Sequence, residues 1–245
     1  MGRITRRSLL AAVGAAAVVP AAAVPAPSTP SGAEAAKTAA SDKPPYLFFN
    51  AQEALFIEAA CERLIPADES GPGALAAGVP AFLDRQLNGA WGAGERLYRS
   101  GPWATGTPSQ GYQLPFTPAE LFHVSLRAVI RTLAARGTPF KEMPQEAQDA
   151  YLKSLESGAH DLDGVPSTEF FDALLKLSIE GFFSDPVYGG NRDMAAWRMI
   201  GFPGAYADYF EAVDRHGVKF QREPMSLAED GQHHLHMSQD IPANL

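Results

Sequence analysis

The feature that most limits the fold of this chain is a series of segments with apolar residues at helical spacing, each closed by proline or glycine. The clearest runs from Thr117 to Gly137, where Thr117 suits the N-cap, Glu120 completes a capping box and Gly137 ends the helix. Four further helices are expected over residues 50–65, 79–89, 144–158 and 167–183. Because no stretch alternates like a strand and no internal repeat appears, the sequence predicts a single, irregular all-α domain.

Helix caps and breakers set the expected boundaries. Asn50 and Glu53 have capping-box spacing, and Pro66 ends the first helix. Ser167 or Thr168 is the expected N-cap of the fifth helix, and a last helix is plausible over residues 205–217.

Long loops rich in glycine and proline separate these helices. Residues 66–78 form one such loop, with Asp68 and Glu69 most simply read as a solvated turn. The segment from Trp91 to Pro115 has no period but carries several aromatic residues, so we expect it to be packed or functional.

Composition excludes several classes of site. Of 245 residues, 46% are hydrophobic and 20% charged, which is ordinary for a globular protein, and the net charge of −8 disfavours bulk nucleic-acid binding. The single cysteine, Cys61, cannot form an internal disulfide, an iron–sulfur cluster or the attachment motif of a c-type haem. On an apolar face, Cys61 is expected to be a buried thiol, with a redox or intermolecular role as the open alternative.

The N-terminus is typical of an exported protein. Residues 1–23 hold three arginines, an apolar stretch and small residues, as in a signal peptide. The pair Arg6-Arg7, followed by Ser8, resembles the twin-arginine signature, with an ordinary secretory signal as the alternative. Residues 24–45 are rich in Pro and Ala and predict a flexible tether. The expected domain then spans residues 46–216, and a polar tail spans 217–245.

Catalytic and metal-binding motifs are scarce. The chain has no dinucleotide fingerprint, P-loop, zinc-protease motif or nucleophile elbow, so we expect no catalytic and no cofactor-binding residue. His233, His234 and His236 could bind copper or nickel weakly, but adventitious affinity of a disordered tail is the better interpretation.

The segment DPVYGGNRDMAAWRMIGFPG, residues 185–204, is the most unusual one. Its glycine pair could bind a phosphate through backbone amides with Arg192 in support, or it could supply the positive φ angles of a structural turn. Asn191 or Asp193 could cap a short helix that follows. Aromatic residues and arginine are typical interface anchors, so a partner-binding role is also open. The residues assigned to that role are Tyr188, Gly189, Gly190, Asn191, Arg192, Trp197 and Phe202.

Two stretches carry a family resemblance. FFSDPVYGGNRDMAAWRMIGFPGA and ERLIPADESGPGALAAGVPAFLDRQL resemble the signature segments of the gluconate 2-dehydrogenase subunit 3 family, and the resemblance covers residues 48 to about 211. It implies a small, non-catalytic subunit beside an FAD-containing large dehydrogenase subunit and a multihaem cytochrome c. It further implies that the complex oxidises a sugar, polyol or aldonate at the periplasmic face of the inner membrane. The small subunit would aid the folding, stability and twin-arginine export of the large one.

A second hypothesis belongs to another class. A stand-alone periplasmic metal or redox protein would use the histidines of the tail. Bound metal or colour in the isolated chain favours this hypothesis, whereas co-purification of a large flavoprotein favours the subunit.

Overall fold

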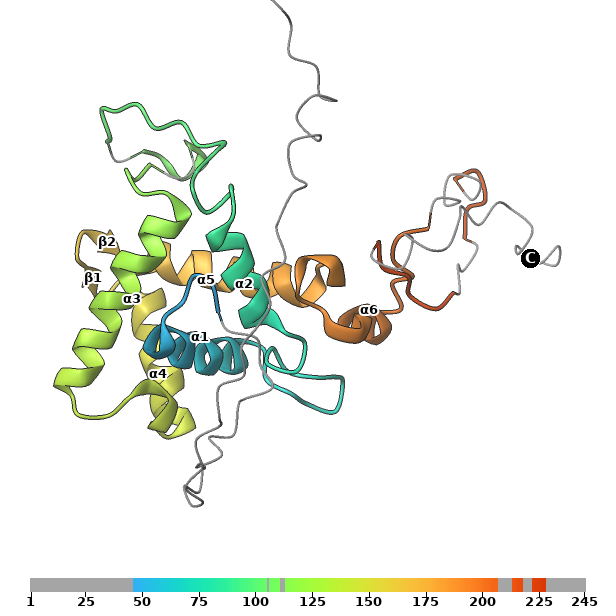
Figure 1. Cartoon of the computed structure of the whole chain (residues 1–245), viewed down its shortest axis with the longest axis horizontal. Coiled ribbons are helices and arrows are strands. Elements are labelled where there is room, and N and C mark those ends of the chain that lie inside the picture. The colour runs from blue at the N-terminus through green and yellow to red at the C-terminus, as the bar shows by residue number, and fades with distance from the viewer. Residues whose placement is uncertain (1–45, 105, 111–112, 207–212, 218–221, 228–245) are drawn as a thin grey trace, which may run out of the picture. The chain divides into compact units, whose positions relative to one another are not determined.

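A computed structural model describes residues 46–104, 106–110, 113–206, 213–217 and 222–227 of the chain (Figure 1). The described part is mainly helical, as the sequence predicts. The α-helices are α1 (Ala51–Leu64), α2 (Val79–Asn88), α3 (Pro118–Ala135), α4 (Gln145–Glu156), α5 (Ser167–Phe183) and α6 (Ala195–Ile200). Four short 3₁₀ turns lie between them: η1 (Pro108–Gln110), η2 (Phe140–Glu142), η3 (Pro186–Tyr188) and η4 (Arg192–Met194). Within the described residues, no helix has both the length and the apolar composition to span a membrane.

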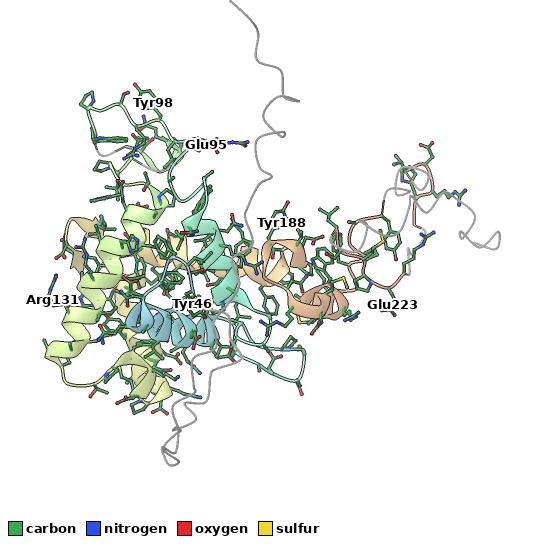
Figure 2. All side chains as sticks on the ribbon, viewed as in Figure 1. Tyr46, Glu95, Tyr98, Arg131, Tyr188 and Glu223 are labelled. Carbon is green, nitrogen blue, oxygen red and sulfur yellow. The ribbon has the colours of Figure 1, made fainter. Side chains whose placement is uncertain are left out.

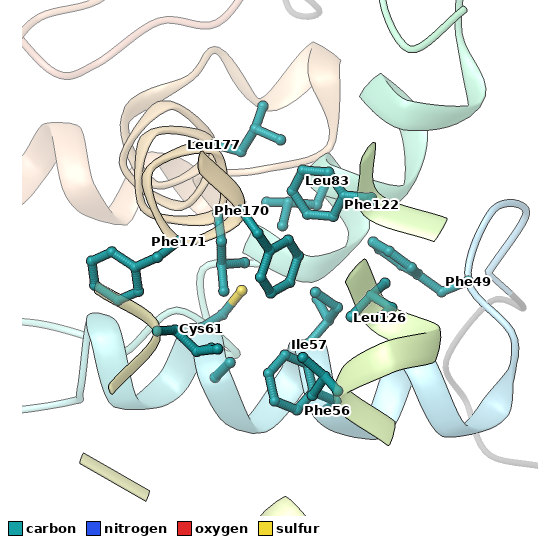
Figure 3. Packing of buried hydrophobic residues seen from close by; sticks show 14 of the residues in the cluster. Phe49, Phe56, Ile57, Cys61, Leu83, Phe122, Leu126, Phe170, Phe171 and Leu177 are labelled. Atoms are coloured by element: carbon teal, nitrogen blue, oxygen red, sulfur yellow. The ribbon is translucent and has the colours of Figure 1, made fainter. Parts of the chain in front are cut away.

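Helix α5 is the central element of the fold. It contacts α1, α2, α3 and α4, and the buried apolar side chains of these helices form one continuous cluster. Phe122 of α3 meets Phe170 of α5 edge to face, with ring centroids 5.4 Å apart, and neither ring is exposed (Figure 3). Ile57 and Cys61 complete the cluster from α1. Cys61 is fully buried, as expected, and this burial raises the pKa of its thiol to about 12.

Both predicted capping boxes are present. The side chain of Asn50 accepts hydrogen bonds from the backbone N–H groups of Gln52 and Glu53 at the start of α1. Thr117 accepts one from Glu120 at the start of α3, and the Glu120 carboxylate accepts one from the Thr117 backbone in return. That backbone donor holds the pKa of Glu120 below its ordinary value, as expected for a carboxylate stabilised in its charged form.

The predicted cap of α5 is wrong. Pro166 is the N-cap residue, and α5 begins with Ser167, which is fully buried. The Ser167 hydroxyl donates instead to the carbonyl of Leu155, 2.9 Å away in α4. The Ser167 side chain therefore forms a hydrogen bond to another helix and does not cap the N-terminus of α5.

A two-stranded antiparallel pair was also not expected. Strands β1 (Asp161–Leu162) and β2 (Val165–Pro166) pair across Asp163 and Gly164, both of which have positive φ. Asp-Gly between two apolar residues is the usual sequence of such a tight hairpin turn.

A glycine permits the close contact between α2 and α5. A methyl group on Gly181 of α5 would lie 2.7 Å from the ring of Phe82 of α2. Phe82 is itself buried, so the ring has little room to move. The two helices therefore approach as closely as they do because position 181 carries no side chain.

Asp84 of α2 fixes the point where the chain enters the domain. The residue is 4% exposed, and its carboxylate accepts hydrogen bonds from the backbone N–H groups of Leu47, Phe48 and Phe49 at 2.8 to 3.1 Å. A buried carboxylate costs little only when its oxygens are paired in this way.

Candidate functional site

The segment of residues 185–204, here called the docking loop, packs against the loop that precedes α2. The backbone N–H of Arg192 donates to the carbonyl of Ala77 at 2.9 Å. Gly78 has a φ of 78° and lies so close to Gly189 that a methyl group on it would be 3.0 Å from the Gly189 carbonyl. The two stretches of sequence that carry the family resemblance therefore touch in space.

The paired glycines of the docking loop have different roles. Gly189 has a φ of 101° and ends η3, so it supplies the positive φ that the sequence suggested for a turn. Gly190 does not share that conformation. It is buried against the backbone of Gly181, where a methyl group would clash with the Gly181 carbonyl.

Phosphate binding by the glycine pair finds no support in this geometry. The Gly189 N–H already donates to the carbonyl of Pro186 at 2.9 Å, and Gly190 is buried. Backbone amides that bind an anion must be free and must face the solvent.

Asn191 holds the docking loop in a strained shape. Its side chain is fully buried, donates to the carbonyl of Ser184 at 3.0 Å and accepts from the N–H of Ala196 at 2.9 Å. It thus satisfies an amide at the start of α6, although Met194 and not Asn191 or Asp193 is the N-cap residue. Asn191, Asp193 and Met194 all have positive φ, which costs about 1–3 kcal/mol per residue and needs such support.

Trp197 lies beneath the docking loop and not on its surface. It is 6% exposed, and its indole N–H donates to the carbonyl of Phe183 at 2.8 Å. Its ring packs edge to face with Phe202, whose ring centroid is 5.2 Å away and which is itself partly exposed.

A segment from beyond the predicted domain holds the docking loop in place. We call residues 222–227 the C-terminal strap. Met225 exchanges backbone hydrogen bonds with Pro203 and Ala205, which makes a short parallel bridge at Gly204. The Asp185 carboxylate accepts hydrogen bonds from the Ser226 hydroxyl at 2.7 Å and from the Leu227 N–H at 2.8 Å. The sequence placed the strap in a polar tail and gave no indication of these contacts.

The outer surface of the docking loop carries several large side chains. Tyr188 is 51% exposed, and its ring stands away from the helical core (Figure 2). Exposed apolar side chains accompany it on the loop and the strap: Val187, Met199, Ile200, Phe202 and Leu227. A large exposed apolar surface is typical of a protein–protein contact.

The predicted partner-binding residues fall into two groups. Tyr188, Arg192 and Phe202 are exposed and can touch another molecule. Gly190, Asn191 and Trp197 are buried, and Gly189 is half-buried, so these four position the exposed ones.

The long loop from Trp91 to Pro115 forms one side of an open groove of about 840 Å³. Trp91 and Trp103 line it from the loop, and Glu169, Asp172 and Lys176 line it from α5. None of the described residues that line the groove belongs to the docking loop, and residues 105, 111 and 112 of this segment are outside the described part.

The metal-binding candidates cannot be placed. His233, His234 and His236 lie outside the described residues, as do the signal peptide, the tether and residues 207–212 of the helix expected over residues 205–217. The described residues at the two ends of that expected helix, 205–206 and 213–217, are not helical. Among the residues that the structure does describe, no group of three or more His, Cys, Asp or Glu side chains is arranged to hold a metal.

The fold and the docking loop define a helical domain that presents a strained, well-supported and partly apolar surface. The model of the gluconate 2-dehydrogenase subunit 3 family matches residues 51–204, and the chain belongs to that family. The match includes the docking loop and ends at Gly204, before the strap. Comparison with curated proteins found no match, and comparison with solved structures found none.

Proposed function

We propose that this chain is a non-catalytic small subunit of a periplasmic flavoprotein dehydrogenase that oxidises a sugar, polyol or aldonate. Family membership supports the assignment to a dehydrogenase complex. FAD belongs to the large partner subunit, and c-type haem belongs to a cytochrome subunit that links the complex to the inner membrane. The small subunit contributes folding, stability and export of its large partner.

The observation that carries this proposal is the construction of the docking loop. Three residues with positive φ are held in place by the buried side chain of Asn191 and by the bond from Arg192 to Ala77. Strain of this kind persists only where surrounding contacts maintain it, and it is common where a surface must be pre-formed for binding. The exposed Tyr188 and Phe202 are thus presented without an ordering cost at the moment of association.

Export by the twin-arginine route is part of the same proposal. Arg6 and Arg7 supply the motif, and that route transports proteins that have already folded. A large subunit without its own signal could cross the membrane bound to this chain, which accounts for a small subunit that carries the signal.

Replacement of Tyr188 by alanine tests the docking surface. A truncated interface aromatic commonly costs about 2–4 kcal/mol of binding, or roughly 30- to 1,000-fold in affinity. We expect a tagged Tyr188→Ala chain to recover far less of the large subunit from the periplasm than the wild type does, measured by quantitative pull-down. Tyr98→Ala is the matched control, because Tyr98 is 79% exposed but lies on the long loop and not on the docking loop.

Two outcomes would contradict the proposal. Undiminished recovery with Tyr188→Ala would remove the docking loop from the interface. Stoichiometric flavin or metal in the isolated wild-type chain would favour a stand-alone redox or metal protein.

A further inference from the structure

Two arginines lie at the junction between the docking loop and α2. A methyl group on Gly189 would be 2.8 Å from Nη1 of Arg85, and one on Gly78 would be 3.5 Å from Nη2 of Arg192. Gly78 and Gly189 are in contact, so the guanidinium groups of Arg85 and Arg192 both lie next to the same pair of glycines. Tyr188 is the chain neighbour of Gly189 and is exposed.

Neither guanidinium has a carboxylate partner among the described residues. Arg63, Arg99, Arg131 and Arg198 each lie within 4 Å of an acidic side chain, whereas Arg85 and Arg192 do not. The acidic residues nearest in sequence are engaged elsewhere: Asp84 accepts the amides of residues 47–49, and Asp185 binds the strap. Asp193 is exposed and forms no ion pair with either arginine.

We propose that Arg85 and Arg192 together form an acceptor for an acidic segment of the large subunit. The inference rests on the proposed function. The two guanidinium groups are exposed, lie at one backbone contact and have no carboxylate partner among the described residues, so they concentrate positive charge at one place in a chain whose net charge is −8. Guanidinium groups bind carboxylates through two parallel N–H···O bonds, which fixes geometry as well as charge.

The neighbouring side chains favour a protein segment as the occupant. Tyr188 and Val187 are exposed and directly precede Gly189 in the chain, so an acidic residue flanked by apolar residues would find apolar side chains on the same loop as the charged contact. Tyrosine and arginine are both enriched among the residues that contribute most to binding at protein interfaces.

Charge reversal tests the acceptor. We expect the double variant Arg85→Glu/Arg192→Glu to recover the large subunit at least tenfold less well than wild type, measured by pull-down of the tagged chain at low salt. Wild-type recovery should fall as salt rises from about 50 to 500 mM, because ion pairs at a partly exposed interface are screened, and the double variant should lose this dependence. Arg127→Glu is the control, because Arg127 is exposed and unpaired but lies on α3.

The outcomes separate this inference from the proposed function. If Tyr188→Ala weakens the complex and the double reversal does not, the proposed acidic-segment acceptor is wrong, but the proposal that the docking loop contacts the large subunit is retained. If neither weakens it, both are overturned. If gluconate binds the isolated wild-type chain in calorimetry and the double reversal abolishes that binding, the arginines serve a free anion and the protein-segment acceptor is wrong. Should the double reversal fail to fold by circular dichroism, Arg85→Gln/Arg192→Gln replaces it, with the same expected loss.

Discussion

Asp84 is the residue on which the entry of the chain into the domain depends. It is an ionisable group in a largely apolar helix interface, and its only compensation in the described part is the set of backbone amides from Leu47, Phe48 and Phe49. Hydrogen bonds to a charged acceptor contribute more than neutral ones, about 1.5–3 kcal/mol each. Water can replace part of that contribution at Leu47, which is exposed, but not at Phe49, which is buried.

Asp84→Ala should therefore lower the free energy of unfolding by about 2–4 kcal/mol, because it leaves the buried amide of Phe49 and the half-buried amide of Phe48 without an acceptor. The measurement is urea unfolding followed by circular dichroism. Asp172→Ala, at an exposed position of α5, should change the same quantity by no more than about 0.5 kcal/mol. Equal stability of the Asp84 variant and wild type would mean that the amides are hydrated and that the carboxylate is dispensable.

Some residues of the candidate site could be predicted from sequence and others could not. Tyr188 and Arg192 are exposed, as their residue types and the surrounding loop suggested. Trp197 was expected either on this surface or packed beneath it, and it is buried, with its indole N–H donating to the carbonyl of Phe183. An aromatic residue in a loop is equally suited to a protein interface and to the buried layer beneath it. For Trp197 the difference depends on the position of the Phe183 carbonyl, which the sequence does not reveal.

At the scale of elements, the contact between α2 and α5 depends on Gly181. Glycine inside a helix ordinarily costs about 0.5–1 kcal/mol relative to alanine, so Gly181→Ala should stabilise an isolated α5. In the folded chain the new methyl group would meet the buried ring of Phe82. Overpacking of this kind usually costs about 1–3 kcal/mol, which exceeds the gain in helix propensity.

We therefore expect Gly181→Ala to lower the melting temperature, measured by circular dichroism or calorimetry. Glu180→Ala, at the exposed neighbouring position, should leave it nearly unchanged. A higher melting temperature for Gly181→Ala would show that Phe82 can move aside and that the approach of the two helices is not limited at this position.

The helices were predictable because their information is local. The capping boxes at Asn50 and Thr117 and the apolar stripes lie within single segments of the sequence. The cap of α5 was not predictable, because the Ser167 hydroxyl donates a hydrogen bond to the carbonyl of Leu155 in another helix. The β1–β2 pair could have been found from Asp163-Gly164. The strap depends on contacts between residues about 40 positions apart, for which a single sequence carries no pattern.

At the scale of the whole molecule, the leader and the domain form one functional unit in our proposal. Replacing Arg6 and Arg7 by lysine keeps the positive charge and removes the twin-arginine pair. We expect this variant and the large subunit to remain in the cytoplasm, measured by fractionation and immunoblotting of both. Normal periplasmic levels of both proteins would contradict joint export. Loss of this chain alone from the periplasm would show that the large subunit is exported independently.

The two carboxylates that hold the terminal segments also determine how the domain would respond to mechanical tension. Force applied at the N-terminal side would act on the three backbone amides that bind the buried Asp84. Force applied at the C-terminal side would act on the hydrogen bonds of Ser226 and Leu227 to Asp185 and on the short bridge at Gly204. Asp185 is only half-buried, so water can compete for its oxygens as the contacts stretch. Tension would therefore detach the strap, and with it one support of the docking loop, before it disturbed the helices.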